Sequence, residues 1–350
     1  MVESSTLGDS LDSPPPQIDE AAAVVLLREA YGVEAEAKAL ACERDATFRI
    51  NAATGDQFTL KVSNPAEPAL DTNFQTEAIL WLEERDPGLP VPKIVRDREG
   101  RSEFQKQMPD GRTSIIRLLT WVAGVPVAQI GVSASLRRDM GRILARLGQA
   151  LRDFDHPSSS HHVQWDIKHA SRLRPLIASL QESPIRQQMI DELDHFDTAI
   201  VPLLAVLRQQ VVHNDFNLHN VLVDPNRPQT VSGVLDFGDM VRTPLIIDLA
   251  VAASYMAHRA DGPLEAVAEI VSAYHAVTPL HPLEVGALRD LIVARLVTTI
   301  AITEWRAARY PQNAEYILRN NPAARVGMAH FAAMPRTLVT QALLHACNME

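Results

Sequence analysis

Residues 211–239 read VVHNDFNLHNVLVDPNRPQTVSGVLDFGD, and the rest of the chain is organised around this stretch. It carries two acidic clusters, His213-Asn214-Asp215 and Asp236-Phe237-Gly238, with Asn220 between them. The apolar run 221–223 predicts a short buried strand, a stretch of turn formers follows, and 230–235 predicts the returning strand. A hairpin of this kind brings Asp215, Asn220 and Asp236 to one end of a rigid element.

The three polar side chains suit phosphoryl transfer from a nucleotide. In that chemistry one carboxylate orients the attacking hydroxyl, while a carboxamide and a second carboxylate hold magnesium on the phosphates. The order His-x-Asp-x4-Asn followed by Asp-Phe-Gly matches the kinase signature, including the five residues from Asp215 to Asn220. Asp-Phe-Gly alone recurs by chance, so the prediction depends on both halves standing at this spacing.

Composition bounds the class of protein. The chain has 350 residues, of which 46% are hydrophobic and 22% charged, as in an ordinary globular protein with one large domain or two lobes. A net charge of −10 argues against nucleic acid or an anionic membrane as a partner. Two distant cysteines, no membrane-length apolar run and no signal peptide in residues 1–17 predict a cytoplasmic protein.

The chain changes character near residue 120. Residues 1–17 are polar and proline-rich and are predicted to be a disordered lead. Before residue 120 the pattern predicts a helix that Asp19 caps and that runs through Ala30, and a second helix at 72–85. It predicts strands at 34–42, 47–52, 57–62, 93–95, 103–108 and 113–119. After residue 120 the pattern predicts helices at 133–154, 170–182, 184–210, 245–258, 263–276 and 282–307. The only strands expected in this half are those of the hairpin at 211–239.

These patterns predict an α+β fold of two lobes with a cleft between them. The N-lobe, residues 18–119, is β-rich with one main helix and is expected to bind the nucleotide phosphates. A hinge at 120–124 leads to a mostly helical C-lobe, residues 125–350, which holds the catalytic hairpin.

In the front lobe, Lys61 closes an apolar strand and Glu77 follows sixteen residues later on the next helix. A strand lysine paired with a helix glutamate is how kinases grip the α- and β-phosphates. On their own, both residues equally fit a solvated surface. The expected phosphate-covering loop, 43–47, contains no glycine, so it would have to use backbone N–H groups and the Thr47 hydroxyl. No GxxxxGK[ST] motif occurs, which excludes a P-loop fold.

Taken together, these residues resemble the aminoglycoside phosphotransferase and choline kinase branch of the protein-kinase-like fold, and within it the hydroxylysine kinase group. The resemblance covers roughly residues 20–330. It departs from the branch at Asn214, where glycine is more frequent, and at Thr47, where asparagine is usual. The stretches that carry it are ERDATF (43–48), FTLKVSNP (58–65), RLLTW (117–121), VLDFGDM (234–240) and RAARYPQNAEYILRNNPAA (306–324).

The resemblance implies ATP or GTP as co-substrate, with Mg²⁺. It implies that Asp215 is the catalytic base or hydroxyl-orienting group, and that Asn220 and Asp236 bind the metal. Lys61, held by Glu77, would neutralise the phosphates.

Further residues take supporting roles in this comparison. Leu119, Thr120 and Val122 would offer backbone groups to the purine edge. His213 would fix the loop backbone through its ring, and Asp248 would hydrogen-bond the catalytic loop from a helix start.

The acceptor is expected to be a small molecule bearing a hydroxyl. Only nine residues separate Gly238 from Asp248, and no Ala-Pro-Glu follows to end a peptide-presenting segment. The candidates for an ammonium group are Asp239, Glu304 and Trp305, although the last two equally fit a helix surface and a core anchor. The candidates for a carboxylate are Arg242, Arg306 and Arg309.

The sequence leaves several alternatives open. A hydroxylysine kinase-like enzyme is the favoured reading. A kinase of another amino alcohol or of an aminoglycoside-like compound fits the same residues. A nucleotide-binding pseudoenzyme is a different class, suggested only by the glycine-free loop. Either a monomer or a homodimer fits the sequence.

Overall fold

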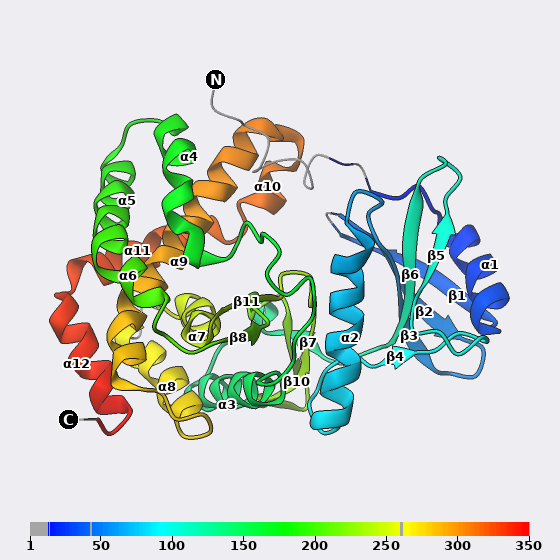
Figure 1. Cartoon of the computed structure of the whole chain (residues 1–350), viewed down its shortest axis with the longest axis horizontal. Helices are drawn as coiled ribbons and strands as arrows, with labels where there is room; N and C mark the ends of the chain where they lie inside the picture. Colours follow the sequence, from blue (N-terminus) through cyan, green and yellow to red (C-terminus); the bar gives the residue numbers. More distant parts are fainter. Residues whose placement is uncertain (1–12, 14, 43, 260–261, 350) are drawn as a thin grey trace. The chain divides into compact units, whose positions relative to one another are not determined.

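The computed structural model describes residue 13 and residues 15–42, 44–259 and 262–349 (Figure 1). The described residues form two compact units. The first runs through Ala123 and includes Asp155–His161, and the second comprises Gly124–Phe154 and the chain from His162 onward. The predicted lobe boundaries and the cleft stay predictions.

The first unit is an antiparallel sheet with a helix on each face (Figure 1). The strand order is β1-β2-β3-β6-β4, and β5 also pairs with β6. The elements lie close to the predicted ranges, and α2 begins three residues earlier than predicted. Their bounds are α1 Glu20–Tyr31, β1 Ala35–Leu40, β2 Ala46–Ala52, β3 Gln57–Val62, α2 Ala69–Arg85, β4 Ile94–Val95, β5 Phe104–Gln107 and β6 Thr113–Thr120.

The predicted start of α1 is confirmed, because the side chain of Asp19 accepts a hydrogen bond from the Ala22 N–H at 2.8 Å. At its other end, Gly32 takes a left-handed φ of 70°, which glycine adopts without strain. The predicted disordered lead lies mostly outside the described residues. Near its end, however, Pro16 is buried and the Ser13 carbonyl accepts a hydrogen bond from Asn64.

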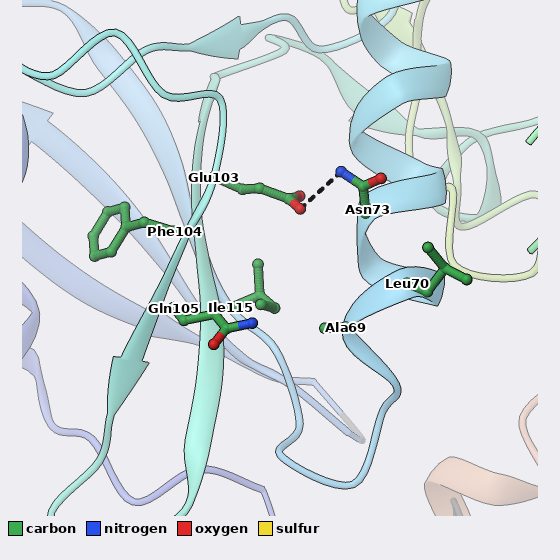
Figure 2. Close-up of a pocket in the computed structure, with 7 residues that line it drawn as sticks. All are labelled: Ala69, Leu70, Asn73, Glu103, Phe104, Gln105 and Ile115. Carbon is green, nitrogen blue, oxygen red and sulfur yellow. Dashed lines mark hydrogen bonds between the residues drawn. The ribbon is translucent and has the colours of Figure 1, made fainter. Parts of the chain in front are cut away.

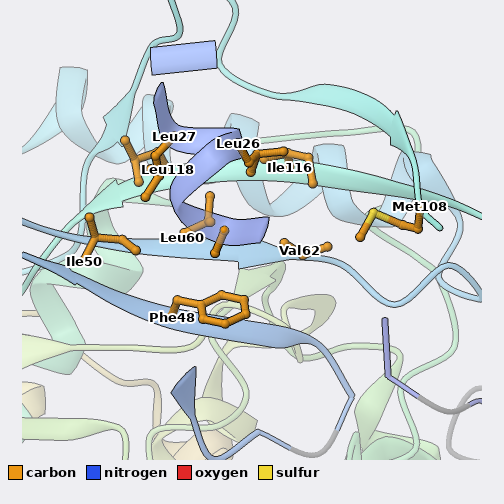
Figure 3. Close-up of a cluster of buried hydrophobic side chains, with 10 residues drawn as sticks. Leu26, Leu27, Phe48, Ile50, Leu60, Val62, Met108, Ile116 and Leu118 are labelled. Atoms are coloured by element: carbon orange, nitrogen blue, oxygen red, sulfur yellow. The ribbon is translucent and has the colours of Figure 1, made fainter. Parts of the chain in front are cut away.

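The face of the sheet toward α1 is the hydrophobic core of this unit (Figure 3). Alternate residues of the strands point to this face, so it is apolar from edge to edge. The side chains that meet there are Ala23, Leu26, Leu27, Phe48, Ile50, Leu60, Val62, Met108, Ile116 and Leu118. The residues between them on β2, β3 and β6, which include Thr47, Lys61 and Arg117, point to the face covered by α2.

Asp155–His161 returns to the first unit and packs on α2. The rings of His156 and His161 lie 5.3 and 5.8 Å from the ring of Phe74. His156 also hydrogen-bonds Asn73, and Ser158 donates to Asp71. This histidine-rich segment therefore braces the helix.

The second unit is mainly helical. Asp248 lies on α7, whose residues are all buried. The helix bounds are α3 Ala134–Ala150, α4 Arg174–Ser179, α5 Pro184–His195, α6 Val201–Leu204, α7 Leu245–Ser254, α8 Pro263–His275, α9 Pro282–Arg309, α10 Ala314–Ile317, α11 Asn321–Ala333 and α12 Arg336–Ala346. The predicted single helix over 184–210 is wrong. A π turn at Phe196–Ile200 and Pro202, which lacks an N–H, interrupt it.

Short strands shape the catalytic region. The predicted hairpin is confirmed as β9, Val221–Asp224, paired with β10, Arg227–Val234, and β7, Val125–Pro126, joins β9. The prediction that this hairpin holds the only strands of the second half is wrong. Gln209–Val212 is a further strand, β8, and it pairs with β11, Val241–Pro244. Among the described residues no helix is long and apolar enough to cross a membrane.

Candidate active site

Two pairs of strands hold the predicted catalytic segments. The loop 213–220 connects β8 to β9, and the segment 235–240 connects β10 to β11. Pairing of Val212 with Val241 closes one end, and pairing of Val221 with Val234 closes the other. The N–H of Leu235 also donates to the Asn220 carbonyl at 2.8 Å. The predicted cluster of Asp215, Asn220 and Asp236 is thus tied at both ends.

The carboxylate of Asp215 is held from two sides. Its Oδ2 accepts hydrogen bonds from the Nδ2 groups of Asn217, at 2.8 Å, and Asn220, at 2.7 Å. Its Oδ1 accepts from Nη2 of Arg295 at 3.1 Å. The side chain remains 19% exposed, which leaves room for one more donor such as an acceptor hydroxyl.

Burial raises the pKa of Asp215 to about 6. Arg295 and the amides of Asn217 and Asn220 lower this pKa, while the nearby charge of Asp236 raises it. The raised pKa makes Asp215 a better proton acceptor than an exposed aspartate, because it lies closer to neutral pH.

His213 and Asp248 hold the catalytic loop by the contacts expected of them. The Nδ1 of His213 accepts from the Asp215 N–H at 3.2 Å, and its Nε2 lies 3.0 Å from the Leu235 carbonyl. Asp248 accepts from the backbone N–H groups of His213, at 3.4 Å, and Asn214, at 2.8 Å. Burial lowers the pKa of His213, so the ring is neutral at pH 7, as a structural role requires.

Asn220 and Asp236 fit a magnesium ion. The Nδ2 group of Asn220 donates to Asp215, so its Oδ1 is the atom available to a cation. Asp236 is exposed, and its Oδ1 accepts from the Gly238 N–H at 3.3 Å. Carboxylate and amide oxygens are the donors that magnesium prefers. Both residues can therefore hold it beside Asp215.

In the first unit, Lys61 has a partner that differs from the predicted one. Its Nζ lies 3.7 Å from Oδ2 of Asp45, in the glycine-free loop. Glu77 is exposed and forms no ion pair with another described residue. The predicted Lys61–Glu77 pair is therefore absent. The orientation of α2 explains this absence. Gln75 bonds Arg117, which pairs with Lys61 in the sheet. Glu77 lies two residues further along, and residues two apart on a helix face different sides.

The covering loop is fixed by Asn64, a residue that the sequence did not single out. Its N–H donates to Oδ1 of Asp45, and its side chain donates to the Arg44 carbonyl, both at 3.0 Å. Thr47 lies across from Lys61 in the sheet, and its buried hydroxyl finds no hydrogen-bond partner among the described atoms. Glu43 lies outside the described residues. Phosphate binding by this loop stays a prediction.

Part of the predicted purine-binding segment already uses its backbone groups for hydrogen bonds within the sheet. Leu119 pairs with Thr59 and Ile94, and the Thr120 N–H donates to the Lys93 carbonyl at 2.9 Å. That donor is not available to a nucleotide. Val122 follows the strand, and its backbone makes no hydrogen bond within the described ranges. Val122 therefore remains the best placed of the predicted backbone contacts.

The structure supports some of the predicted acceptor-binding residues and not others. Asp239 is half-buried and interacts electrostatically with Arg295, which touches Asp215. Glu304 lies nine residues beyond Arg295, about 13.5 Å further along α9. Its Oε1 already accepts hydrogen bonds from Asn321 and Arg325 of α11.

The contacts of the other acceptor candidates do not support a role in binding the acceptor. Trp305 is covered by Arg309, 5.6 Å from the ring centre. Arg306 is half-buried, and Arg242 is a β11 residue whose carbonyl accepts from Lys168. Of the predicted acceptor contacts among the described residues, only Asp239 is supported by proximity to Arg295, which bonds Asp215.

The sequence reasoning did not single out Arg295, whose side chain donates to Asp215. A signal existed, because Arg295 is the only charged residue in the apolar run 291–303. A lone charge in a buried helix needs a partner of opposite charge.

A hollow of about 370 Å³ lies between the start of α2 and β5 (Figure 2). Within it, Asn73 donates to Glu103 at 2.9 Å. It is lined by Ala69, Leu70, Asn73, Glu103, Phe104, Gln105 and Ile115, and none of the predicted site residues is among them.

The chain is similar to known kinases over most of its length. The chain is 27% identical over 342 residues to hydroxylysine kinase of Mus musculus, covering 91% of this chain and 89% of that one. It is 30% identical over 206 residues to homoserine kinase of Methylobacterium radiotolerans, covering 57% and 59%.

Solved structures share the fold. An amicoumacin kinase has a TM-score of 0.66 at 13% identity, covering 92% of this chain and 97% of that one. A microcompartment-associated aminopropanol kinase has a TM-score of 0.64 at 18% identity, covering 93% and 99%. The protein-kinase-like α+β fold predicted from the sequence is confirmed. Because residues 37–288 match the family described as "Phosphotransferase enzyme family", the chain belongs to that family and is a small-molecule kinase.

Proposed function

We propose that the chain transfers the γ-phosphoryl group of ATP or GTP to the side-chain hydroxyl of a hydroxy amino acid, with 5-hydroxylysine as the first candidate. The observation that carries the proposal is the Asp215 carboxylate, held by Asn217, Asn220 and Arg295 beside Asp236. A carboxylate fixed in this way is suited to receive a hydroxyl.

The relatives narrow the acceptor class. Hydroxylysine and homoserine, in the names of two relatives, are both α-amino acids with a side-chain hydroxyl. Such a molecule presents an ammonium, a carboxylate and the reacting group. Asp239 is a candidate for the ammonium, because it lies within electrostatic range of Arg295 at the catalytic carboxylate.

In the proposed reaction, the acceptor hydroxyl donates its hydrogen bond to Asp215, which orients the oxygen toward the γ-phosphorus. The new bond joins this oxygen to phosphorus, and the bond from phosphorus to the β,γ-bridging oxygen breaks. The proton passes to the Asp215 carboxylate, and the diphosphate nucleotide leaves. Orientation is the main contribution of the protein, because the transition state of phosphoryl transfer is loose.

Two further groups act on the phosphates in this proposal. Lys61 neutralises phosphate charge from β3, and Val122 offers its backbone to the purine. Magnesium, held by Asn220 and Asp236, supplies charge neutralisation of the phosphate oxygens when bound. A cytoplasmic location, with Cys42 and Cys347 both free thiols, belongs to the same proposal.

The decisive experiment measures release of diphosphate nucleotide with magnesium, in parallel for ATP and GTP. The acceptor panel contains 5-hydroxylysine, homoserine, 1-amino-2-propanol and an aminoglycoside. The Asp215→Asn variant is the matched control, because it keeps the size of the side chain and removes its charge.

Each outcome of the acceptor panel tests a different part of the proposal. Turnover that depends on hydroxylysine and is lost in Asp215→Asn supports the proposal in full. Turnover with another member keeps the mechanism and replaces the acceptor. Equal turnover by the parent and Asp215→Asn contradicts the proposed role of this carboxylate. Nucleotide binding without turnover on any acceptor favours a pseudoenzyme.

A further inference from the structure

Arg295 is a buried cation in an otherwise uncharged segment of α9. Its side chain is only 2% exposed. Burying a guanidinium is costly unless anions and hydrogen-bond acceptors surround it, so its partners indicate what it is for.

The partners of Arg295 converge on the catalytic carboxylate. Its Nη2 donates to Oδ1 of Asp215 at 3.1 Å and to the Tyr255 hydroxyl at 3.4 Å. Its Nη1 donates to the Trp165 carbonyl at 3.1 Å, and its Cζ lies 5.2 Å from the centre of the Trp165 ring. Besides Asp215, two residues thus hold the guanidinium, Trp165 and Tyr255.

We propose that Arg295 is a positioning residue for phosphoryl transfer, which orients Asp215 toward the acceptor hydroxyl. This inference depends on the proposed function, in that Asp215 must be the group that receives the hydroxyl. Asn217 and Asn220 both hold Oδ2, so on their own they leave the carboxylate free to swing about that oxygen. The contact of Arg295 with Oδ1 removes this freedom.

A lysine cannot replace Arg295 in this role. The guanidinium spans Asp215, Tyr255 and the Trp165 carbonyl at once, whereas an ammonium is a compact point charge on a flexible stem. A misplacement of the catalytic group by about 1 Å is enough to cost about 100-fold in rate. The Arg295→Lys variant therefore retains the charge and loses the geometry.

The test compares two buried arginines of α9. Arg289 is 1% exposed and bonds Glu192 and Asp290, so Arg289→Lys is the matched control for loss of a buried guanidinium. We expect Arg295→Lys to lower kcat by about 100-fold, with the KM of nucleotide within about threefold of the parent. We expect Arg289→Lys to lower the Tm without this loss of kcat.

Two further measurements separate positioning from a structural role. In an Asp215→Asn background, adding Arg295→Lys is expected to cause no further loss of kcat, because the group that it positions is already disabled. In Arg295→Ala, guanidinium at sub-denaturing concentration is expected to restore part of the rate, with no gain for Arg289→Ala.

Unchanged kcat in Arg295→Lys, or an equal loss of kcat in Arg289→Lys, overturns the inference. Independent, additive losses in the Asp215→Asn background overturn it as well. Failure of hydroxylysine as acceptor is a separate result. Slow transfer to water, measured as acceptor-independent release of diphosphate nucleotide, involves the same carboxylate and allows the same comparison.

Discussion

Asn214, next to Asp215, has a left-handed φ of 62°. Glycine reaches this region without strain, and asparagine tolerates it better than other residues do. The backbone therefore restricts which residues can occupy position 214. The Asn214 amide is also fully buried and makes no hydrogen bond within the part of the chain that the structure describes.

We predict that Asn214→Gly is more stable than Asn214→Ala by about 1–2 kcal/mol, because both variants remove the buried amide and only alanine keeps the left-handed strain. Urea unfolding of the two variants measures this difference. Equal free energies of unfolding would show that the backbone relaxes at this site.

Lys61 is the residue proposed to contact the nucleotide phosphates. Lys61→Met is expected to raise the KM of the nucleotide by about tenfold or more, because a charge-assisted contact to phosphate is lost. Glu77→Gln is expected to change this KM by less than about twofold, because Glu77 faces solvent without an ion-pair partner among the described residues. Steady-state kinetics at saturating acceptor measure both. A Glu77→Gln defect as large as that of Lys61→Met would mean that the pair forms during turnover.

Asp97 gives a pH-dependent prediction. Burial opposes its charge, but this is outweighed by hydrogen bonds from the backbone N–H and Nε of Arg101 and from the Glu99 N–H, so the pKa lies below its usual range. A carboxyl with a lowered folded-state pKa stabilises the fold above its unfolded pKa of about 3.9. That contribution is lost as the pH falls through the folded pKa.

We therefore expect Asp97→Asn to lower the free energy of unfolding by about 1 kcal/mol at neutral pH. The gap between parent and variant is expected to close below about pH 4. Denaturant unfolding of both proteins across this range measures the gap. A gap that stays constant with pH would assign the effect of the substitution to packing rather than charge.

At the scale of elements, we predict opposite effects on stability when each of two glycines of α3 is replaced by alanine. A Cβ at Gly141 would lie 2.3 Å from the Ile270 carbonyl oxygen of α8, whereas a Cβ at Gly148 would meet nothing closer than 3.5 Å. Gly141→Ala is expected to destabilise by about 1–3 kcal/mol through overpacking. Gly148→Ala is expected to stabilise by about 0.5–1 kcal/mol through helix propensity. Thermal unfolding of both variants compares them, and destabilisation by both would mean that the helices cannot adjust at either glycine.

The catalytic hairpin could be predicted from sequence because its signals are local. Turn formers at 224–228 separate two apolar runs, and the polar triad stands at a known spacing. The pairing of β8 with β11 could not be predicted in the same way. Each strand has only four residues, and β8 follows a helical stretch whose apolar pattern continues into it. Yet this pairing closes the catalytic loop.

The sequence also could not show which side chains of different elements contact one another. The sequence indicated that α2 follows the strand of Lys61, but not that Gln75, which bonds Arg117 of β6, faces the sheet while Glu77 is exposed. Side-chain direction on a helix depends on its rotation against the sheet, which tertiary packing decides. The contact of Arg295 with Asp215 spans 80 residues, so only its buried charge gave a sequence-level hint.

At the scale of the whole molecule, a ligand that binds only the folded chain must raise its stability. A nucleotide with magnesium at about 100 times its Kd is expected to add about 2.7 kcal/mol to the free energy of unfolding. Chelation of the metal is expected to remove most of this gain, because the phosphates then meet Asp236 without a neutralising cation. The same dependence is expected for whichever of ATP and GTP is the co-substrate.

Thermal shift with nucleotide, with and without chelator, measures this increment in four proteins: the parent, Asn220→Ala, Asp236→Ala and Asn226→Ala. Asn226 is an exposed residue of the turn between β9 and β10, so its variant controls for a change in the hairpin itself. We expect the metal-dependent part to vanish in the first two variants and to persist in Asn226→Ala. Persistence in Asp236→Ala would move the metal to other oxygens and remove Asp236 from the proposed site.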